Sequence, residues 1–178
     1  MQAAAPDALD RASRVRLMLF DVDGVLTDGR LWYGPAGEAL KAFSAADGQG
    51  IKLLQESGTA VAILSGRRSE AVTQRAAELA ITHVMQGVED KLEAFEALAA
   101  RLGLAAAAAG FMGDDLVDLP LLRRCGFACA PRGAHELVRA NAHYIAARPP
   151  GEGAAREVCE FVMRAQGRLE GALARFLP

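Results

Sequence analysis

Residues 17–29 read Leu-Met-Leu-Phe-Asp-Val-Asp-Gly-Val-Leu-Thr-Asp-Gly, an apolar run that ends at two aspartates one residue apart. The run 17–20 has the length and continuous hydrophobicity of a strand buried on both faces of a parallel sheet. Ligands of such sheets bind beyond the carboxyl ends of the strands, so we expect Asp21 in a crevice rather than in the core. Gly24 permits the sharp turn that follows.

The two aspartates of this stretch suit phosphoryl transfer. Because side chains alternate along an extended chain, Asp21 and Asp23 can point toward the same side and hold a hard cation such as Mg²⁺. One carboxylate can attack phosphorus and form an aspartyl phosphate, while the other protonates the leaving oxygen. The same residues also fit a simple turn or part of a calcium loop, but no Glu follows at the spacing of an EF-hand loop.

Composition bounds the class of protein. The chain has 178 residues, enough for one domain, and a net charge of −2. No basic patch for nucleic acid or polybasic run for a membrane is present. Residues 1–14 lack a signal-peptide core and no apolar run approaches the ~20 residues of a membrane span, so we expect a cytoplasmic protein. Cys125, Cys129 and Cys159 form no Cys-x-x-Cys pair and are expected as buried, reduced thiols.

Strand-like runs alternate with helix-like runs, which predicts an α/β fold of the Rossmann-like three-layer α/β/α type with a central parallel sheet. We expect residues 1–14 to be a flexible segment and residues 15–178 a single domain without a cap domain. Residues 105–109 either extend a helix or form a loop. After the first strand, the strands are expected at 59–64, 83–85, 110–112, 126–130 and 143–146, and the helices at 50–56, 69–80, 89–102 and, once or twice, within 154–176 with a break near Gly167.

Residues 30–45 do not fit this alternation. Two short strand-like runs flank Gly-Pro-Ala-Gly, which predicts a β-hairpin. A projecting hairpin would expose Leu31, Trp32 and Phe43 unless another surface covers them. We therefore interpret the hairpin as a subunit interface, with packing inside one chain as the alternative.

Three later motifs each carry polar residues after a strand or at a helix start. Ser65 follows an apolar run and can present its hydroxyl and nearby N–H groups to an anion at a helix N-terminus, or simply cap that helix. Lys91 stands at a predicted helix start and either neutralises a phosphoryl oxygen or is solvated. Asp114, Asp115 and Asp118 repel one another, so a bound cation explains the cluster better than helix capping does.

Taken in order, these motifs resemble those of the haloacid dehalogenase superfamily of phosphohydrolases. The resemblance implies that Asp21 is the nucleophile and Asp23 the general acid and base, whose backbone carbonyl also binds the metal. It implies that Ser65 supplies a hydroxyl that binds the phosphoryl group and that Lys91 balances its charge. It also implies that Asp114 is a metal ligand and that Asp115 and Asp118 are accessory acids. The implied cofactor is Mg²⁺.

The chain resembles more closely the family of 3-deoxy-D-manno-octulosonate 8-phosphate phosphatases, from about Val15 to Arg168. The distinctive pieces include Lys41-Ala42-Phe43, residues 47–51 and residues 113–120. This resemblance implies a capless homotetramer that assembles through the 30–45 hairpin. It also implies sugar-phosphate contacts from Asp23, Ser44, Ala45, Ala46, Asp47, Gly48, Lys52, Gly66, Arg67, Arg75 and Lys91.

At two places the sequence differs from that family, and both differences affect the expected recognition of the sugar and not the phosphate chemistry. Residues 44–46 are Ser-Ala-Ala where relatives often carry Asn-Val-Arg, and residues 150–152 are Pro-Gly-Glu where relatives often carry a basic residue. The substrate carboxylate would be met by Arg67, by Arg75 or by a neighbouring subunit. We therefore expect a Mg²⁺-dependent phosphomonoesterase of an eight- or nine-carbon sugar acid phosphate, favouring the octulosonate 8-phosphate.

Two alternatives differ from this hypothesis. One is a phosphatase of nonulosonate 9-phosphates, which shares the chemistry and differs in kcat/KM for the two sugars. The other is a catalytically idle oligomerising module, against which the intact set of acids and Lys91 argues. A small-molecule sugar phosphate is thus the expected partner, and neither nucleic acid nor a membrane is.

Overall fold

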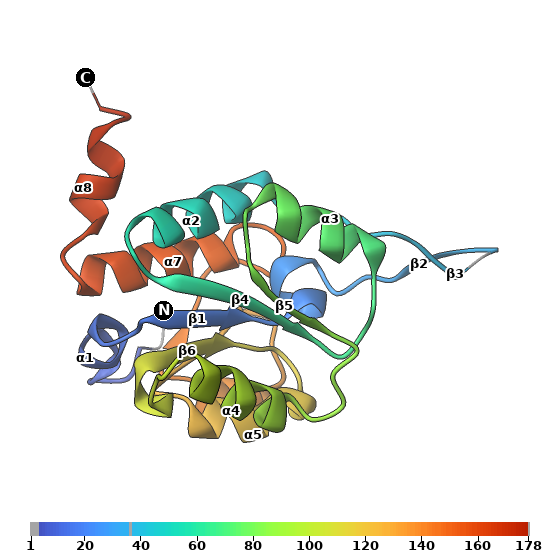
Figure 1. Cartoon of the computed structure of the whole chain (residues 1–178), viewed down its shortest axis with the longest axis horizontal. Coiled ribbons are helices and arrows are strands. Elements are labelled where there is room, and N and C mark those ends of the chain that lie inside the picture. The colour runs from blue at the N-terminus through green and yellow to red at the C-terminus, as the bar shows by residue number, and fades with distance from the viewer. Residues whose placement is uncertain (1–3, 36, 178) are drawn as a thin grey trace.

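Six parallel strands form the central sheet of the protein, in the order β5-β4-β1-β6-β7-β8 (Figure 1). This computed structural model describes residues 4–35 and 37–177, so Ala36 of the predicted hairpin turn, residues 1–3 and residue 178 lie outside the described residues. The strands are β1 Leu17–Phe20, β4 Ala60–Ser65, β5 His83–Gln86, β6 Ala109–Met112, β7 Phe127–Ala130 and β8 Tyr144–Ile145. All five neighbouring pairs are parallel, which confirms the predicted sheet.

Helices cover both faces of this sheet and make the three predicted layers (Figure 1). The helices are α1 Ala8–Ser13, α2 Ala45–Glu56, α3 Glu70–Glu78, α4 Lys91–Arg101, α5 Leu119–Arg124, α6 Glu136–Asn141, α7 Ala154–Ala165 and α8 Leu169–Ala174, with short turns at Val22–Leu26, Ala106–Ala108 and Leu116–Asp118. Helices α2, α3 and α7 lie on one face, and α4 and α5 lie on the other. None of the helices in the described residues is long and apolar enough to cross a membrane.

Strand β1 supplies both cores because its side chains alternate between the two faces of the sheet. Met18 and Phe20 lie in the core beneath α2 and α7, whereas Leu17 and Leu19 lie in the core with Phe95 of α4. All four β1 side chains are buried, as the continuous apolar run predicted. The three cysteines are free and buried, which confirms that prediction.

Helix α2 begins at Ala45, five residues before its predicted start. Glycines at positions 48 and 50 concealed this turn, because glycine is a poor helix former. Tertiary packing requires both glycines: a Cβ on Gly48 would lie 2.1 Å from the Arg75 guanidinium, and one on Gly50 would lie 2.8 Å from the Cα of Arg156. Small residues here let α2 approach α3 and α7 closely, and this contact offsets the low helix propensity.

The N-terminal segment contains a helix, and the alanine run forms a short turn. Residues 8–13 form α1, whose buried Ala8 and Ala12 pack in the core that α7 shares. This helix has no sequence signal, because the segment carries too few apolar residues for a periodic pattern. Residues 106–108 form one 3₁₀ turn and not a helix extension. The predicted break near Gly167 separates α7 from α8.

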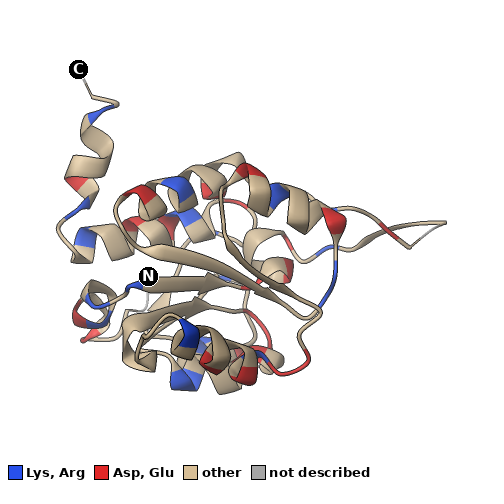
Figure 2. Cartoon of the chain, in the orientation of Figure 1, with Lys and Arg blue, Asp and Glu red and all other residues tan. Residues whose placement is uncertain are grey.

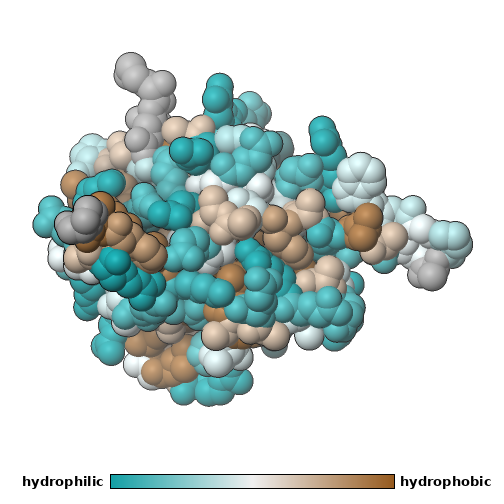
Figure 3. All heavy atoms as spheres, turned by 90° about the horizontal axis from the view of Figure 1, so that it is seen from above, coloured by the Kyte–Doolittle hydropathy of each residue, from teal (hydrophilic) through white to brown (hydrophobic). Residues whose placement is uncertain are grey.

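The predicted hairpin is present as strands β2 Trp32–Gly34 and β3 Gly37–Leu40, paired antiparallel. It projects from the body of the molecule in the ribbon and space-filling views (Figures 1 and 3). Trp32 is 53% exposed, and Tyr33 and Leu40 are exposed as well. Phe43 is covered within the chain, because the chain returns to the body before α2 and Phe43 packs against the core.

Candidate active site

Asp21 stands directly after β1, the strand between β4 and β6 in the sheet. Strands β4 and β6 belong to the two halves of the fold that the chain builds on opposite sides of β1, so Asp21 marks the point where a crevice opens. Its side chain is largely buried, and one oxygen accepts a hydrogen bond of 2.7 Å from the Val22 amide. The tight turn that follows returns the chain so that Asp23 also faces the crevice.

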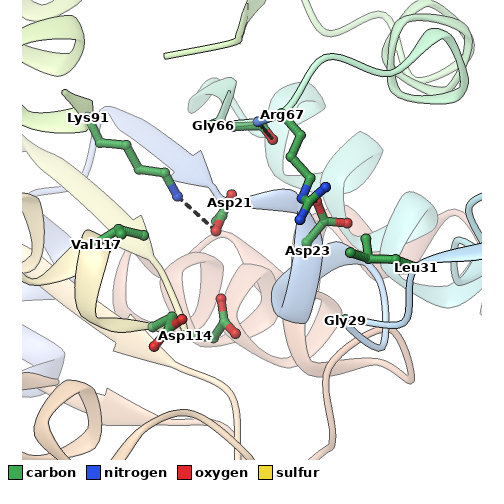
Figure 4. A pocket seen from close by; sticks show the side chains of 11 residues that line it. Asp21, Asp23, Gly29, Leu31, Gly66, Arg67, Lys91, Asp114 and Val117 are labelled. Carbon is green, nitrogen blue, oxygen red and sulfur yellow. Dashed lines mark hydrogen bonds and ion pairs between the residues drawn. The ribbon is translucent and has the colours of Figure 1, made fainter. Parts of the chain in front are cut away.

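A cavity of about 440 Å³ opens at this point (Figure 4). Its walls come from the loops after β1, β4 and β6 and from the start of α4, so four separate segments meet at one edge of the sheet. Figure 2 shows acidic residues on the loops that leave this edge. The lining residues include eight of the predicted site residues: Asp21, Asp23, Ser65, Gly66, Arg67, Lys91, Asp114 and Asp115.

Lys91 is buried and binds two carboxylates. Its ammonium nitrogen lies 2.8 Å from Asp21 and 2.7 Å from Asp118, so the alternative of a solvated lysine was wrong. Burial lowers the pKa of Lys91, but the two carboxylates outweigh this effect and the net shift is upward. Lys91 therefore carries a fixed positive charge against Asp21, as Figure 4 shows by the dashed contact.

Asp118 is fully buried and orders the last motif. One oxygen binds Lys91, and the other accepts hydrogen bonds from the amides of Asp114, at 2.9 Å, and Asp115, at 3.2 Å. Asp115 caps the short turn that follows through the Leu116 amide at 2.8 Å. Asp118 thus links the position of Lys91 to the loop that carries Asp114.

Asp114 faces Asp21 across the cavity, and the pair creates an unbalanced negative charge (Figure 4). Burial, followed by repulsion from Asp21 and Asp118, raises the pKa of Asp114 to about 7. Burial also raises the pKa of Asp21 to about 6, even though Lys91 opposes the shift. Carboxylates whose ionisation is disfavoured in this way gain stability from a bound cation.

The described residues contain one acidic group suited to a metal ion: oxygens of Asp21, Asp114 and Asp118 lie within 4.8 Å of one another. Oxygen ligands are those that Mg²⁺ prefers. The residues therefore fit the predicted cation, and Asp21 and Asp114 stay its predicted side-chain ligands, because both line the cavity whereas Asp118 does not. The role of the Asp23 carbonyl as a ligand stays a prediction.

Position 24 must be glycine because the Asp114 carboxylate packs against it. Its φ is +82°, and a Cβ there would lie 2.0 Å from an oxygen of Asp114. Only glycine leaves room for Asp114 to approach the turn after β1. The Asp-x-Asp-Gly motif therefore serves the site twice, through its acids and through the missing side chain.

Ser65 is buried at the end of β4 and lines the cavity, but it does not begin a helix. Helix α3 starts at Glu70, so the predicted helix N-terminus at Ser65 was wrong. Instead, the Ser65 hydroxyl accepts a hydrogen bond of 3.3 Å from the Arg67 amide within the loop. The loop holds Ser65, Gly66 and Arg67 at the cavity wall.

Asp23 is held by two cations. Arg67 places its Nε 3.8 Å from one carboxylate oxygen and donates a hydrogen bond of 3.2 Å to the hydroxyl of Tyr33. The other oxygen binds the ammonium of Lys41, for which the sequence predicted no role at the site. Lys41 was missed because it belongs to the hairpin, 18 residues away from Asp23.

The remaining predicted sugar contacts do not line this cavity within one chain. Ser44 caps α2, and Ala45 and Arg75 border a separate cavity of about 400 Å³. Asp47 is buried and accepts hydrogen bonds from the amides of Gly153, at 3.2 Å, and Arg156, at 2.8 Å. Ala46, Gly48 and Lys52 are likewise outside the catalytic cavity. Sugar binding by these seven residues stays a prediction.

Comparison with known proteins bears on the identity of this site. Residues 80–158 match the haloacid dehalogenase-like hydrolase family. The chain is 44% identical over 168 residues to the 3-deoxy-D-manno-octulosonate 8-phosphate phosphatase KdsC of Yersinia pestis, covering 94% of this chain and 90% of that protein.

Solved structures agree with this relationship. A probable YrbI family phosphatase of Pseudomonas syringae is 46% identical, with a TM-score of 0.95, covering 98% of this chain and 99% of that one. The 3-deoxy-D-manno-octulosonate 8-phosphate phosphatase of Moraxella catarrhalis, solved with magnesium, phosphate and KDO, is 39% identical, with a TM-score of 0.93, covering 96% and 98%. With its acids and Lys91 at the expected edge of the same fold, the chain belongs to the 3-deoxy-D-manno-octulosonate 8-phosphate phosphatase family of haloacid dehalogenase-like hydrolases.

Proposed function

We propose that the protein hydrolyses 3-deoxy-D-manno-octulosonate 8-phosphate to the free sugar acid and phosphate, with Mg²⁺ as cofactor. The observation that carries the proposal is the buried Lys91–Asp21 pair, 2.8 Å long, which faces Asp114 at the mouth of the sheet. The family relationship supports the substrate, since the relatives in Yersinia pestis and Moraxella catarrhalis are phosphatases of this sugar phosphate.

The first half of the reaction transfers the phosphoryl group to the protein. A carboxylate oxygen of Asp21 attacks phosphorus, and the bond from phosphorus to the sugar oxygen breaks with its electron pair on that oxygen. Asp23 gives its proton to the departing oxygen and becomes a carboxylate. Lys91 lies against Asp21 and balances the negative charge that gathers on the equatorial phosphoryl oxygens, which the Ser65 hydroxyl also contacts.

The second half releases phosphate. Asp23 now takes a proton from a water molecule, and the water oxygen attacks phosphorus while the bond to Asp21 breaks. Phosphate leaves, Asp21 is again a carboxylate and Asp23 again carries the proton. Asp21 and Asp114 would hold Mg²⁺, which would supply positive charge that stabilises the negative charge of the transition state.

Arg67 is the candidate for recognising the substrate carboxylate. Its guanidinium borders the cavity beside Asp23, and its side chain is 50% exposed, so it can turn toward a ligand. Residues 44–46 lack the basic residue that relatives often carry, so a nonulosonate 9-phosphate is the competing substrate. A panel of both sugar phosphates with Mg²⁺ decides between them: a higher kcat/KM for the nonulosonate would overturn the octulosonate assignment.

We further propose that the protein works in the cytoplasm as a homotetramer that assembles through the 30–45 hairpin. Exposed Trp32, Tyr33 and Leu40 support an interface, because a projecting hairpin buries little apolar surface on its own. Sedimentation of the wild type and of Trp32→Asp tests this. A tetramer that persists unchanged in the variant would remove the hairpin from the interface.

The Asp21→Asn variant tests the reaction class. It removes the nucleophile but keeps the shape of the side chain, so hydrolysis of both the sugar phosphate and an aryl phosphate should fall by at least ~10³-fold. The matched control is Glu93→Gln on the exposed side of α4, which should keep full activity. Near-wild-type activity in Asp21→Asn, or wild-type hydrolysis that persists with a chelator, would contradict the mechanism.

A further inference from the structure

Lys41 forms a second buried ion pair at the site, which parallels the pair between Lys91 and Asp21. Its side chain is 1% exposed, and its ammonium contacts a carboxylate oxygen of Asp23 and lies 3.1 Å from Glu38. The two aspartates of the motif therefore each have a buried lysine as a partner. We propose that Lys41 is the positioning residue that holds Asp23 in its place for proton transfer.

Lys41 acts on the site from outside the catalytic cavity. Asp23 borders that cavity, whereas Lys41 borders the neighbouring one together with Phe43 and Arg75. The ammonium thus reaches the Asp23 carboxylate from a residue that borders the neighbouring cavity and does not line the catalytic one. Within the catalytic cavity, its influence therefore passes through Asp23.

The burial of Lys41 restricts the rotation of the Asp23 side chain. An ammonium taken out of water is strongly destabilising unless carboxylates surround it, so any rotation of Asp23 away from Lys41 would leave the charge poorly compensated. Arg67 holds the other oxygen of Asp23 more loosely, at 3.8 Å and with a half-exposed side chain. Lys41 is therefore the rigid partner of Asp23, and Arg67 is the one able to move toward a ligand.

The hairpin sets the location of Lys41. Strand β3 ends at Leu40, so Lys41 is the first residue after it, and its second partner Glu38 lies within that strand. Strand β2 contributes as well, because Tyr33 accepts a hydrogen bond from Arg67. Both cations on Asp23 are thereby connected to the hairpin, which links the hairpin to the position of Asp23.

This inference rests on the proposed function, and Lys41→Met tests it. The variant keeps a chain of similar length without the charge. A misplaced acid and base should lower kcat for the sugar acid phosphate about 10- to 100-fold, with KM changing less than about 3-fold. Lys41→Arg, which keeps the charge, should retain more activity than Lys41→Met.

The leaving group separates positioning from a general loss of structure. The phenolate of 4-nitrophenyl phosphate departs without a proton, so the first-turnover burst of nitrophenolate should survive in Lys41→Met while the later steady state slows. In an Asp23→Asn background, adding Lys41→Met should cause no further loss of kcat, because the residue acts through Asp23. Glu38→Gln is the matched control: it removes the other partner of Lys41 and should stay within about 3-fold of wild type.

Several results would overturn the assignment. One is a kcat for Lys41→Met within threefold of wild type. Another is a loss of kcat on adding Lys41→Met to Asp23→Asn that is as large as its loss in the wild-type background. The third is a loss of kcat in Glu38→Gln as large as that in Lys41→Met. Should Lys41→Met not fold, Lys41→Gln is judged by the same criteria. A wild-type enzyme that cleaves aryl phosphate but not the sugar phosphate overturns only the substrate, and Lys41 is then tested with a simple alkyl phosphate. Absence of all phosphatase activity overturns both proposals.

Discussion

The ammonium nitrogen of Lys91 lies 2.8 Å from a carboxylate oxygen of Asp21, and this contact joins the first residue of α4 to the end of β1. A cation at a helix N-terminus is unfavourable, since the helix dipole is positive there. The carboxylates of Asp21 and Asp118 offset this penalty and hold the lysine in place. Lys91 is thus unfavourable for the helix by itself, and its ion pairs with the two carboxylates stabilise it at this position.

Replacing Lys91 with Met should abolish most of the activity. The variant leaves Asp21 and Asp118 as buried acids without their shared cation, so we expect kcat to fall at least ~10²-fold, as for the loss of one transition-state contact. Steady-state kinetics with saturating Mg²⁺ measures this, and circular dichroism checks the fold. Activity within tenfold of wild type would show that Mg²⁺ alone balances the charge.

Replacing Asp114 with Asn should stabilise the metal-free protein at neutral pH. The pKa of Asp114 is about 7 in the folded state, against an ordinary value of 3.8. Between these values the folded state binds more protons than the unfolded state, so the free energy of unfolding falls as pH rises from about 4 to 7. Asn does not ionise, so the variant keeps this stability. We expect its free energy of unfolding to exceed that of the wild type by about 1–2 kcal/mol, which is less than the full pKa shift implies because the site is partly exposed.

Urea unfolding with a chelator at pH 5 and pH 7.5 measures this difference. The gain should be present at pH 7.5 and small at pH 5, where wild-type Asp114 carries its proton. Addition of Mg²⁺ should stabilise the wild type and leave Asp114→Asn unchanged. A variant that is less stable than wild type at pH 7.5 without metal would contradict the repulsion at this site.

The affinity for Mg²⁺ should rise with pH. Asp114 and Asp21, whose pKa values are about 7 and about 6, must lose their protons to bind a cation, so metal and proton compete. We expect the dissociation constant to fall by roughly tenfold or more between pH 6 and pH 8, from the linkage of one or two protons. Calorimetric titration of the wild type checks this. An affinity that is constant over this range would mean that both acids are already ionised.

Replacing Asp47 should affect stability rather than catalysis. Its carboxylate accepts hydrogen bonds from two amides at the start of α7, and burial raises its pKa against the opposing effect of these bonds. Asp47→Ala leaves both amides without this acceptor, which should cost about 2–4 kcal/mol of unfolding free energy. Asp47→Asn keeps one acceptor oxygen and should cost less.

The same variants test the predicted contact of Asp47 with the sugar. Chemical unfolding and KM for the sugar phosphate are measured side by side. A stable Asp47→Ala protein whose KM rises tenfold would place Asp47 in the substrate site, whereas a destabilised protein with unchanged KM would confirm that Asp47 holds the start of α7.

Local pattern was enough to predict most of the fold and the acids of the site. The strand 17–20, the hairpin within 30–45 and the order of alternating elements follow from hydrophobic periodicity and turn residues, which act between near neighbours. Asp21, Asp23 and Asp114 could be predicted because each follows a buried strand, and the carboxyl ends of parallel strands meet at one edge. The start of α2 could not, because its glycines serve packing against α3 and α7.

The sequence by itself thus determined the order of the elements and the kind of chemistry, since both depend on residue type and short spacing. Only the tertiary structure decided which charges face one another. In the folded protein, Lys91 is buried between Asp21 and Asp118. Asp47 accepts a hydrogen bond from an amide of α7, and Lys41, next to the hairpin, contacts Asp23. These contacts join residues distant in the chain, and the energy of a buried charge depends on its surroundings in space, which no local pattern contains.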